Sequence, residues 1–302
     1  MKQKVSLVLS GGGARGIAHI GVIEELEKQG YEIVAITGTS MGALVGGIFA
    51  LEKLEEFKTW LFSLDKMKVF KLIDFSFSTQ GLIKGDRVFN HIKEFISDKK
   101  IEDLRIDYAA VAVDLLNKKE VVFREGSIYE AIRASVAIPT VITPVNAENT
   151  LLIDGGVLNN IPVSHAKRVA GELLIAVNVN ADIPVYKPAL IKNNHETKES
   201  VYLKKMRDFQ NYLKKAAPAD DNESLGYFDL INKTIGMMTE HIALASLEKY
   251  PPDILIEISK KTCGTFDFYK AEELVEIGRY SAMKCLEGNE NKAIKQNRNP
   301  LL

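Results

Sequence analysis

The stretch ITGTSMGALVGG, residues 36–47, places Ser40 between two glycines, Gly38 and Gly42. The apolar residues just before it predict a buried strand, and the residues from Met41 onward predict a glycine-rich helix. GTSMG between a strand and a helix fits the G-x-S-x-G pattern, in which a sharp turn exposes a serine hydroxyl at the top of a sheet. A tight turn without chemistry would use the same residues, so the rest of the sequence has to separate a turn from a nucleophile.

Strand-like and helix-like segments alternate around this stretch. VSLVL, residues 5–9, is a short apolar run, and after the next glycines the residues Ile17, Ile20, Ile23 and Leu26 recur at helical spacing. Strands separated by helices predict an α/β fold with a mostly parallel sheet covered on both faces.

Further elements are expected along the chain. They are the strands YAAVAVDL, KEVVFREG, TLLID, ELLIAVNV and DILIEI, and helices at residues 128–135, after Pro162, at residues 225–249 and at residues 270–286, followed by a polar, frayed tail. We expect residues 1 to about 180 to form the core and the later elements to pack on it without forming an independent domain.

Composition excludes several classes of protein. The 302 residues are 46% hydrophobic and 26% charged with a formal net charge of -1, so no global field favours nucleic acid. Cys263 and Cys285 show no metal-binding spacing and fit a reducing compartment. The sequence has no signal-peptide pattern and no apolar run long enough to span a membrane, so a cytoplasmic protein is expected.

A serine nucleophile needs a base, and the usual base is histidine. The five histidines are His19, His91, His165, His195 and His241. None follows a late strand as an α/β-hydrolase triad requires. Asp154 instead ends an apolar strand and precedes Gly155 and Gly156, at an edge of the sheet where sites gather. A simple Asp-Gly turn is the alternative, and Asp114, beside a hairpin bend, is a rival base.

The loop SGGGARG, residues 10–16, supplies backbone N–H groups that could hold an oxyanion. The candidate donors are Gly11, Gly12, Gly13, Ala14 and, from the elbow itself, Met41. Arg15 could orient the loop or meet an anionic group. The glycines, with Gly16, also fit the dinucleotide pattern G-x-G-x-x-G, but the next strand ends without the acidic residue that such a site needs. We therefore expect no nucleotide cofactor.

GGGARG, GTSMG and DGG in this order and spacing resemble the patatin-like phospholipase family, and ASVAIPTVITPV resembles the family's sequence before the Asp motif. The resemblance covers residues 5–171 and leaves residues 172–302 without an assigned function. It implies a three-layer α/β/α fold, a lipid or ester substrate, Ser40 as nucleophile, Asp154 as its base and an oxyanion hole in the glycine loop. A regulatory or lipid-binding protein on the same fold is the alternative.

Two segments could contact lipid. Residues 60–82 are rich in Phe, Leu and Met and contain the only Trp, so they could line an acyl pocket or rest on a bilayer, although a core helix plus a loop also fits. Residues 187–215 carry eight Lys or Arg against three acids, a net +5, with an apolar stripe (Tyr202, Met206, Phe209 and Leu213). Peripheral membrane contact is one interpretation of this segment, and a helix packed on the core is the other.

Overall fold

The computed structural model describes residues 2–72, 75–78, 81–83, 86–96, 99–139, 141–147, 149–186 and 227–298. Its strands are β1 (Gln3–Leu9), β2 (Tyr31–Thr39), β3 (Phe75–Ser78), β4 (Gly81–Ile83), β5 (Asp107–Asp114), β6 (Lys119–Phe123), β7 (Val145–Ala147), β8 (Thr150–Asp154), β9 (Leu173–Ala181) and β10 (Ile254–Ser259). The segment 187–215 and His195 lie outside the described residues, so both interpretations of that segment stay predictions.

The main sheet is mixed and mostly parallel. Its order is β10-β9-β1-β2-β5-β8-β7, with β6 paired to β5. The neighbours from β10 to β5 run parallel, whereas β6, β7 and β8 pair in antiparallel fashion. The carboxyl ends of β1 and β2 are therefore adjacent, which brings the glycine loop beside the serine turn.

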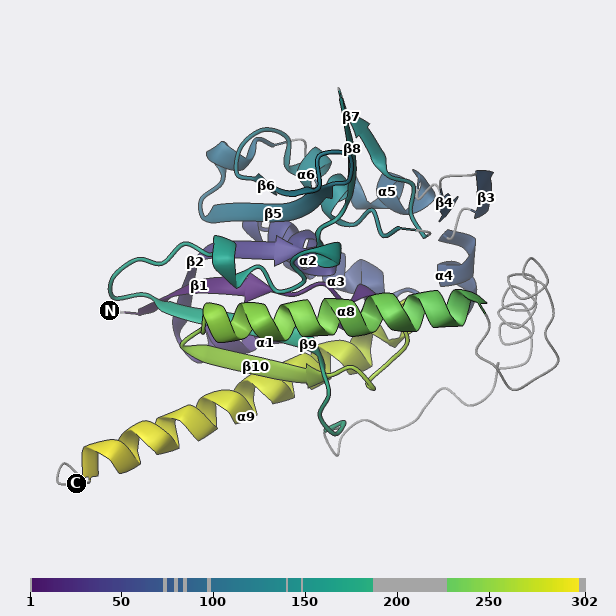
Figure 1. The fold of residues 1–302 in the computed structure, drawn as a ribbon. Helices are drawn as coiled ribbons and strands as arrows, with labels where there is room; N and C mark the ends of the chain where they lie inside the picture. The colour runs from purple at the N-terminus through teal and green to yellow at the C-terminus, as the bar shows by residue number, and fades with distance from the viewer. Residues whose placement is uncertain are drawn as a thin grey trace.

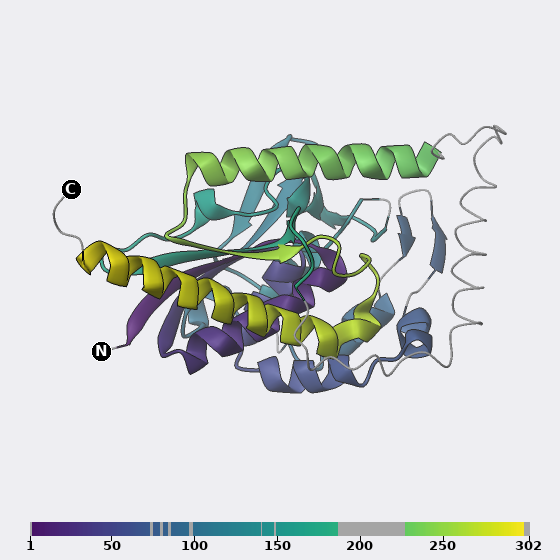
Figure 2. The ribbon, with the colours of Figure 1, turned by 90° about the horizontal axis from the view of Figure 1, so that it is seen from below.

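The helices form layers on the two faces of this sheet. They are α1 (Ala18–Lys28), α2 (Met41–Ala50), α3 (Leu54–Phe62), α4 (Lys66–Leu72), α5 (Asp86–Ile92), α6 (Ile128–Ser135), α8 (Tyr227–Lys249) and α9 (Ala271–Arg298), with short 3-10 turns η1 (Gly13–Ile17), η2 (Ile101–Asp103), η3 (Gly155–Val157), η4 (Val163–His165) and η5 (Phe268–Lys270). Figure 1 shows α8 running along one face, and Figure 2 shows α1 and α9 on the other. This is the three-layer α/β/α arrangement that the family resemblance implies.

Each face of the sheet has its own apolar core. The larger core joins inward-facing residues of β1 and β9, such as Leu7 and Val177, to α1, α2 and α9. A smaller core places Val8, Leu174 and Ala176 under Ala243 of α8. Adjacent residues of β1 thus contribute to opposite cores, as the alternation of side chains along a buried strand requires.

The C-terminal region is joined to the core through both sheet and helix. β9 pairs with β1, so the predicted division at residue 171 falls within one continuous sheet and remains a prediction. α9 crosses α1 at two glycines: a Cβ on Gly21 would lie 1.9 Å from Val275 O, and a Cβ on Gly278 would lie 1.9 Å from Ala18 O. The two helix backbones therefore touch where they cross.

Two expectations about helices were wrong. The segment after Pro162 forms only a 3-10 turn, η4, before the chain returns to irregular structure. The final helix does not end near Leu286, because α9 continues to Arg298 through the polar tail that was expected to fray. The hairpin bend after Asp114 and the short helix at residues 128–135 agree with the sequence.

Candidate active site

Ser40 forms a sharp elbow between β2 and α2. It has φ 55 and ψ -123, a conformation that residues with side chains rarely adopt. A Cβ on Gly42 would lie 2.2 Å from Leu9 O, so only glycine lets α2 begin this close to the end of β1. Ser40 is 5% exposed and makes no side-chain cap bond to its helix.

The backbone of the elbow is fixed by polar groups from other elements. Ser135, at the end of α6, accepts a hydrogen bond from Ser40 N (2.8 Å) and donates one to Val111 O (2.6 Å). Thr39 donates its hydroxyl to Asn159 O at 2.8 Å. The sequence motifs predict no role for Ser135 or Asn159, although Ser135 lies in the segment ASVAIPTVITPV that carries part of the family resemblance.

Asp154 lies at the end of β8 with its carboxyl buried. Oδ1 accepts the Gly156 N–H at 2.7 Å, while Oδ2 has no hydrogen-bond partner among the described residues. Burial raises the pKa of Asp154 to about 6, and the neighbouring Ser40 hydroxyl and Gly156 N–H oppose that rise. The Ser40 hydroxyl therefore lies near the Asp154 carboxyl, although no hydrogen bond joins the two groups in this structure.

Glycines allow close packing around the Asp-Gly-Gly turn and the elbow. A Cβ on Gly155 would lie 2.3 Å from Val111 O, and a Cβ on Gly156 would lie 3.0 Å from Asp154 Oδ1. Gly38 is also closely packed, since a Cβ added there would lie 2.5 Å from Ala43 N. Gly155 therefore lets the Asp-Gly-Gly turn pack against the backbone of β5, and Gly38 lets the end of β2 pack against the first turn of α2.

The glycine loop lies beside the elbow, but two of its expected donors are already in use. A Cβ on Gly11 would lie 3.1 Å from Ser40 Cβ, which places the loop next to the serine. Gly11 N donates to Asn160 O at 3.0 Å, and Ala14 N donates to Thr265 O at 2.9 Å. The expectation that both amides are free donors is wrong, because contacts with distant parts of the chain saturate them.

Three expected donors remain open. Among the described residues, the N–H groups of Gly12, Gly13 and Met41 have no hydrogen-bond acceptor. Gly13 has φ 56, a left-handed conformation that suits glycine. Gly16 packs against Met41, since a Cβ there would lie 2.5 Å from Met41 Cγ.

Arg15 points its guanidinium at neutral acceptors of the protein. Nε and Nη2 donate to Asn180 Oδ1 at 3.1 and 2.9 Å, and Nη1 donates to Cys263 O at 3.3 Å. Of the two expected roles, these contacts favour orientation of the loop.

Two of the histidines and the rival aspartate have contacts away from the proposed dyad. His19 is fully buried and donates Nε2–H to Ser10 O at 2.8 Å, and burial lowers its pKa to about 4. His165 pairs with Glu120 at 2.6 Å. Asp114 accepts hydrogen bonds within its hairpin, chiefly from the Asn117 side chain, which lowers its pKa to about 2. Such a carboxylate is a weak base.

An apolar cavity opens onto Ser40. It measures about 150 Å³ and is lined almost entirely by carbon. Its wall includes Trp60, Leu61, Leu64, Val69 and Leu72 from α3, α4 and the turn between them, together with Leu44, Phe57, Val136, Ile138, Phe266 and Phe268. The described part of segment 60–82 thus lines a cavity at the candidate nucleophile; the side chains of residues 73–82 lie outside the description.

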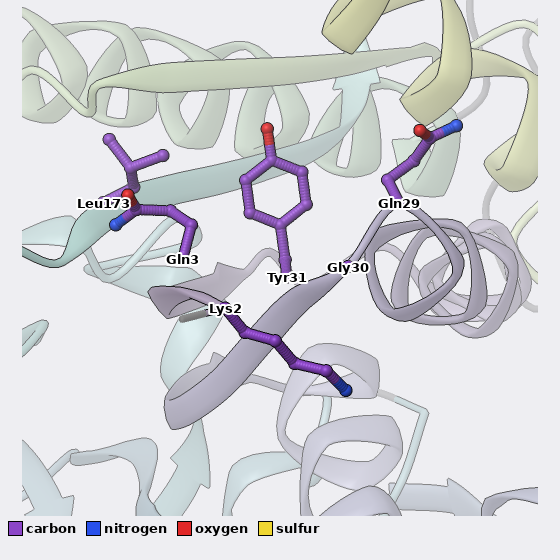
Figure 3. Close-up of a pocket in the computed structure, with 6 residues that line it drawn as sticks. All are labelled: Lys2, Gln3, Gln29, Gly30, Tyr31 and Leu173. Carbon is purple, nitrogen blue, oxygen red and sulfur yellow. The ribbon is translucent and has the colours of Figure 1, made fainter.

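A second hollow lies at the opposite end of the sheet. Figure 3 shows its lining, Lys2, Gln3, Gln29, Gly30, Tyr31 and Leu173, at the amino ends of β1, β2 and β9. Gln3 donates to Gly171 O and Gln29 donates to Glu25, so these amides serve the local fold. This hollow holds none of the expected site residues.

The described residues provide neither a metal-binding cluster nor a helix that could span a membrane. No group of three or more His, Cys, Asp or Glu side chains there is placed to hold a metal ion. Within the same residues, no helix combines the length and the apolar character that crossing a bilayer demands.

Comparison with known sequences places the chain in a family. The sequence model of the family described as patatin-like phospholipase matches residues 7–167, more than half of the chain. The chain belongs to the patatin-like phospholipase family. Membership supports lipid hydrolysis as the class of activity.

The proteins to which this chain is similar differ in length. Uncharacterized NTE family proteins of Mycobacterium bovis and Mycobacterium tuberculosis are 34% identical over 95% of this chain and 92% of their own length. Lysophospholipase NTE1 of Kluyveromyces lactis is 27% identical over 91% of this chain, which corresponds to 19% of that protein. A solved structure, VipD from Legionella pneumophila, aligns over 95% of this chain at 14% identity with a TM-score of 0.43.

Proposed function

We propose that this protein is a serine lipid acyl hydrolase that cleaves carboxylic esters of lipids through a Ser40–Asp154 dyad. The observation that carries the proposal is the pairing of a strained serine elbow with a buried carboxyl whose Oδ2 has no other partner. Such strain persists where the surrounding structure enforces it, and it clusters at functional sites.

In the first half-reaction, Asp154 accepts the proton from the Ser40 hydroxyl while Oγ attacks the ester carbonyl. The N–H groups of Gly12, Gly13 and Met41 stabilise the oxyanion. The intermediate then collapses, the proton on Asp154 passes to the departing alcohol, and an acyl-enzyme forms. In the second half-reaction Asp154 takes a proton from water, the hydroxide attacks the acyl carbonyl, and Ser40 recovers its proton.

The pKa of Asp154 suits this role. A carboxylate with a pKa near 4 is a poor acceptor for a serine proton, and burial raises the value to about 6. The carboxylate form still predominates at neutral pH, so the base is available without a histidine.

The apolar cavity would hold the acyl chain. Its carbon-lined wall offers no partner for a charged head group, and it reaches Ser40 itself. We place the head group outside it. Contact with a membrane surface and a cytoplasmic location remain part of the proposal, with no cofactor required by the mechanism.

Kinetics on a chromogenic short-chain ester test the dyad. Ser40→Ala should abolish turnover, and Asp154→Asn should lower kcat on the order of 10³-fold or more, as loss of a catalytic base does in other serine hydrolases. Turnover that survives in Ser40→Ala would end the dyad assignment. A wild-type protein that binds lipid without turnover would instead support the non-catalytic alternative.

A further inference from the structure

The glycine loop is held by residues beyond the part of the chain that the family comparison matches. Thr265 O, in the turn after β10, accepts the Ala14 N–H at 2.9 Å. Cys263 O, in the same turn, accepts from Arg15 at 3.3 Å. Asn180, near the end of β9, contacts the loop at two points. These anchors follow residue 167, where the match ends.

Asn180 uses both ends of its amide. Nδ2 donates to Gly11 O at 2.6 Å, at the start of the loop. Oδ1 accepts from Nε and Nη2 of Arg15 at 3.1 and 2.9 Å, at the far end of the loop. The backbone of Asn180 is fixed in turn, because its N–H donates to Asn178 Oδ1 at 2.9 Å. One side chain therefore spans the loop.

The bond to Gly11 O has a consequence for the next amide. A trans peptide is planar, with its C=O and N–H on opposite sides. Because Asn180 holds the Gly11 carbonyl toward itself, the Gly12 N–H must point away from Asn180. Gly12 N–H is one of the donors without an acceptor among the described residues.

Hydrogen-bond geometry, not an ion pair, holds the far end of the loop. Arg15 makes no salt bridge with a carboxylate among the described residues, and its hydrogen bonds end on an amide oxygen and a backbone carbonyl. The planar fork of the guanidinium fits such fixed acceptors.

We propose that Asn180 is a positioning residue for the oxyanion hole, which it aims by fixing the Gly11–Gly12 peptide while it anchors Arg15. This rests on the proposed function of Ser40 as a nucleophile. On this proposal the C-terminal region takes part in catalysis indirectly. β9 and the turn at residues 263–265 set the direction of the backbone N–H donors in the N-terminal glycine loop.

Asn180→Asp separates the two ends of the amide. The aspartate keeps an oxygen for Arg15, and adds charge to that contact, but it loses the N–H that holds Gly11 O. We expect kcat on a chromogenic ester, per mole of folded protein, to fall about 10- to 100-fold, because a misaimed donor costs that much in comparable sites. KM should change little, since Asn180 does not line the apolar cavity.

Asn146→Asp is the matched control, because it makes the same change at an exposed position of β7. Asn180→Ala, which loses both contacts, serves if the aspartate variant fails to fold. A kcat within twofold of wild type in the folded Asn180 variants would overturn the positioning role and leave the dyad standing.

Hydrogen–deuterium exchange tests the positioning without relying on activity. The Gly11 and Ala14 amides are hydrogen-bonded and should exchange faster in Asn180→Asp than in wild type or Asn146→Asp. Unchanged exchange together with unchanged kcat would contradict the inference. If wild type shows no turnover, the proposed function fails, and the exchange result alone then decides whether Asn180 holds the loop.

Discussion

Ser40 adopts a backbone conformation that is close to the mirror image of an extended residue, with φ 55 and ψ -123. Glycine populates such a region without steric cost, whereas any residue with a Cβ is strained there by about 1–3 kcal/mol. This strained conformation places the hydroxyl next to the glycine loop. Other contacts of the fold must offset the free-energy cost of the strain.

Replacing Ser40 with glycine should therefore stabilise the protein. We expect Ser40→Gly to be more stable than Ser40→Ala by about 1 kcal/mol in urea unfolding, after the larger chain entropy of unfolded glycine is subtracted. Both variants lack the hydroxyl, so the comparison isolates the backbone. Equal stability of the two would show that the elbow is not strained.

Asp154 should also cost stability when it is ionised. Its folded pKa of about 6 lies above the ordinary value of 3.8, so the folded state holds the proton more tightly than the unfolded state. The contribution of Asp154 to the free energy of unfolding is most favourable below pH 4. It is lost as the pH rises through 6, and above that pH the ionised carboxylate destabilises the folded state by the full amount.

Asp154→Asn removes the penalty. At pH 8 we expect the variant to be more stable than wild type by about 1–3 kcal/mol although its kcat is much lower, and the difference in stability should vanish near pH 4. Chemical unfolding across this pH range measures it. A variant that loses stability at pH 8 would mean that burial does not penalise the carboxylate.

Motifs alone predicted Ser40 and Asp154 as site residues, but they did not show which amides are free. In the sequence GGGARG, the backbone N–H groups of residues 11–14 are four equivalent candidate donors. Two of them are saturated by Asn160 O and Thr265 O, which lie about 150 and 250 positions away in the sequence. Asn180 and Ser135 were missed for the same reason, since hydrogen bonds across such separations leave no local pattern.

At the scale of elements, the crossing of α1 and α9 depends on backbone contact. A Cβ on Gly278 would lie 1.9 Å from Ala18 O, so Gly278→Ala must push the helices apart. We expect a loss of about 1–3 kcal/mol in the free energy of unfolding. Gly288→Ala, on the same helix with nothing within 4 Å, should instead be neutral or stabilising by up to about 1 kcal/mol. Equal effects would refute the close crossing.

The cavity wall formed by α3, α4 and their turn gives the proposed acyl site its size. Leu64→Phe should fill part of the cavity and lower kcat/KM for long-chain esters relative to short-chain esters by roughly 10-fold or more. Leu115→Phe makes the same change on the exposed β5–β6 bend, 48% exposed, and should leave the ratio unchanged. A constant ratio in Leu64→Phe would place the acyl chain elsewhere.

Local patterns predicted most elements well, because apolar periodicity and glycine positions mark strands, helices and their ends. They failed where that signal is weak. The polar sequence from Asn289 onward has no apolar stripe, yet α9 continues through it to Arg298. The residues after Pro162 look helical in composition, but they form only one short turn.

At the scale of the molecule, the order of the strands could not be read from the sequence. A mostly parallel sheet follows from the alternation of elements, but the insertion of β1 between β2 and β9 is a non-local choice. That choice places the glycine loop between the elbow and the end of β9, so residues from both ends of the chain meet around Ser40.

The most direct test of the whole account is labelling of the purified protein with a fluorophosphonate probe, read on a gel. The reagent needs an activated serine and an oxyanion hole together, which are the two features of the site that we propose. We predict that wild type is labelled and that labelling disappears in Ser40→Ala. An unlabelled wild type, or a Ser40→Ala variant labelled as strongly as wild type, would contradict the assignment of Ser40 as the nucleophile.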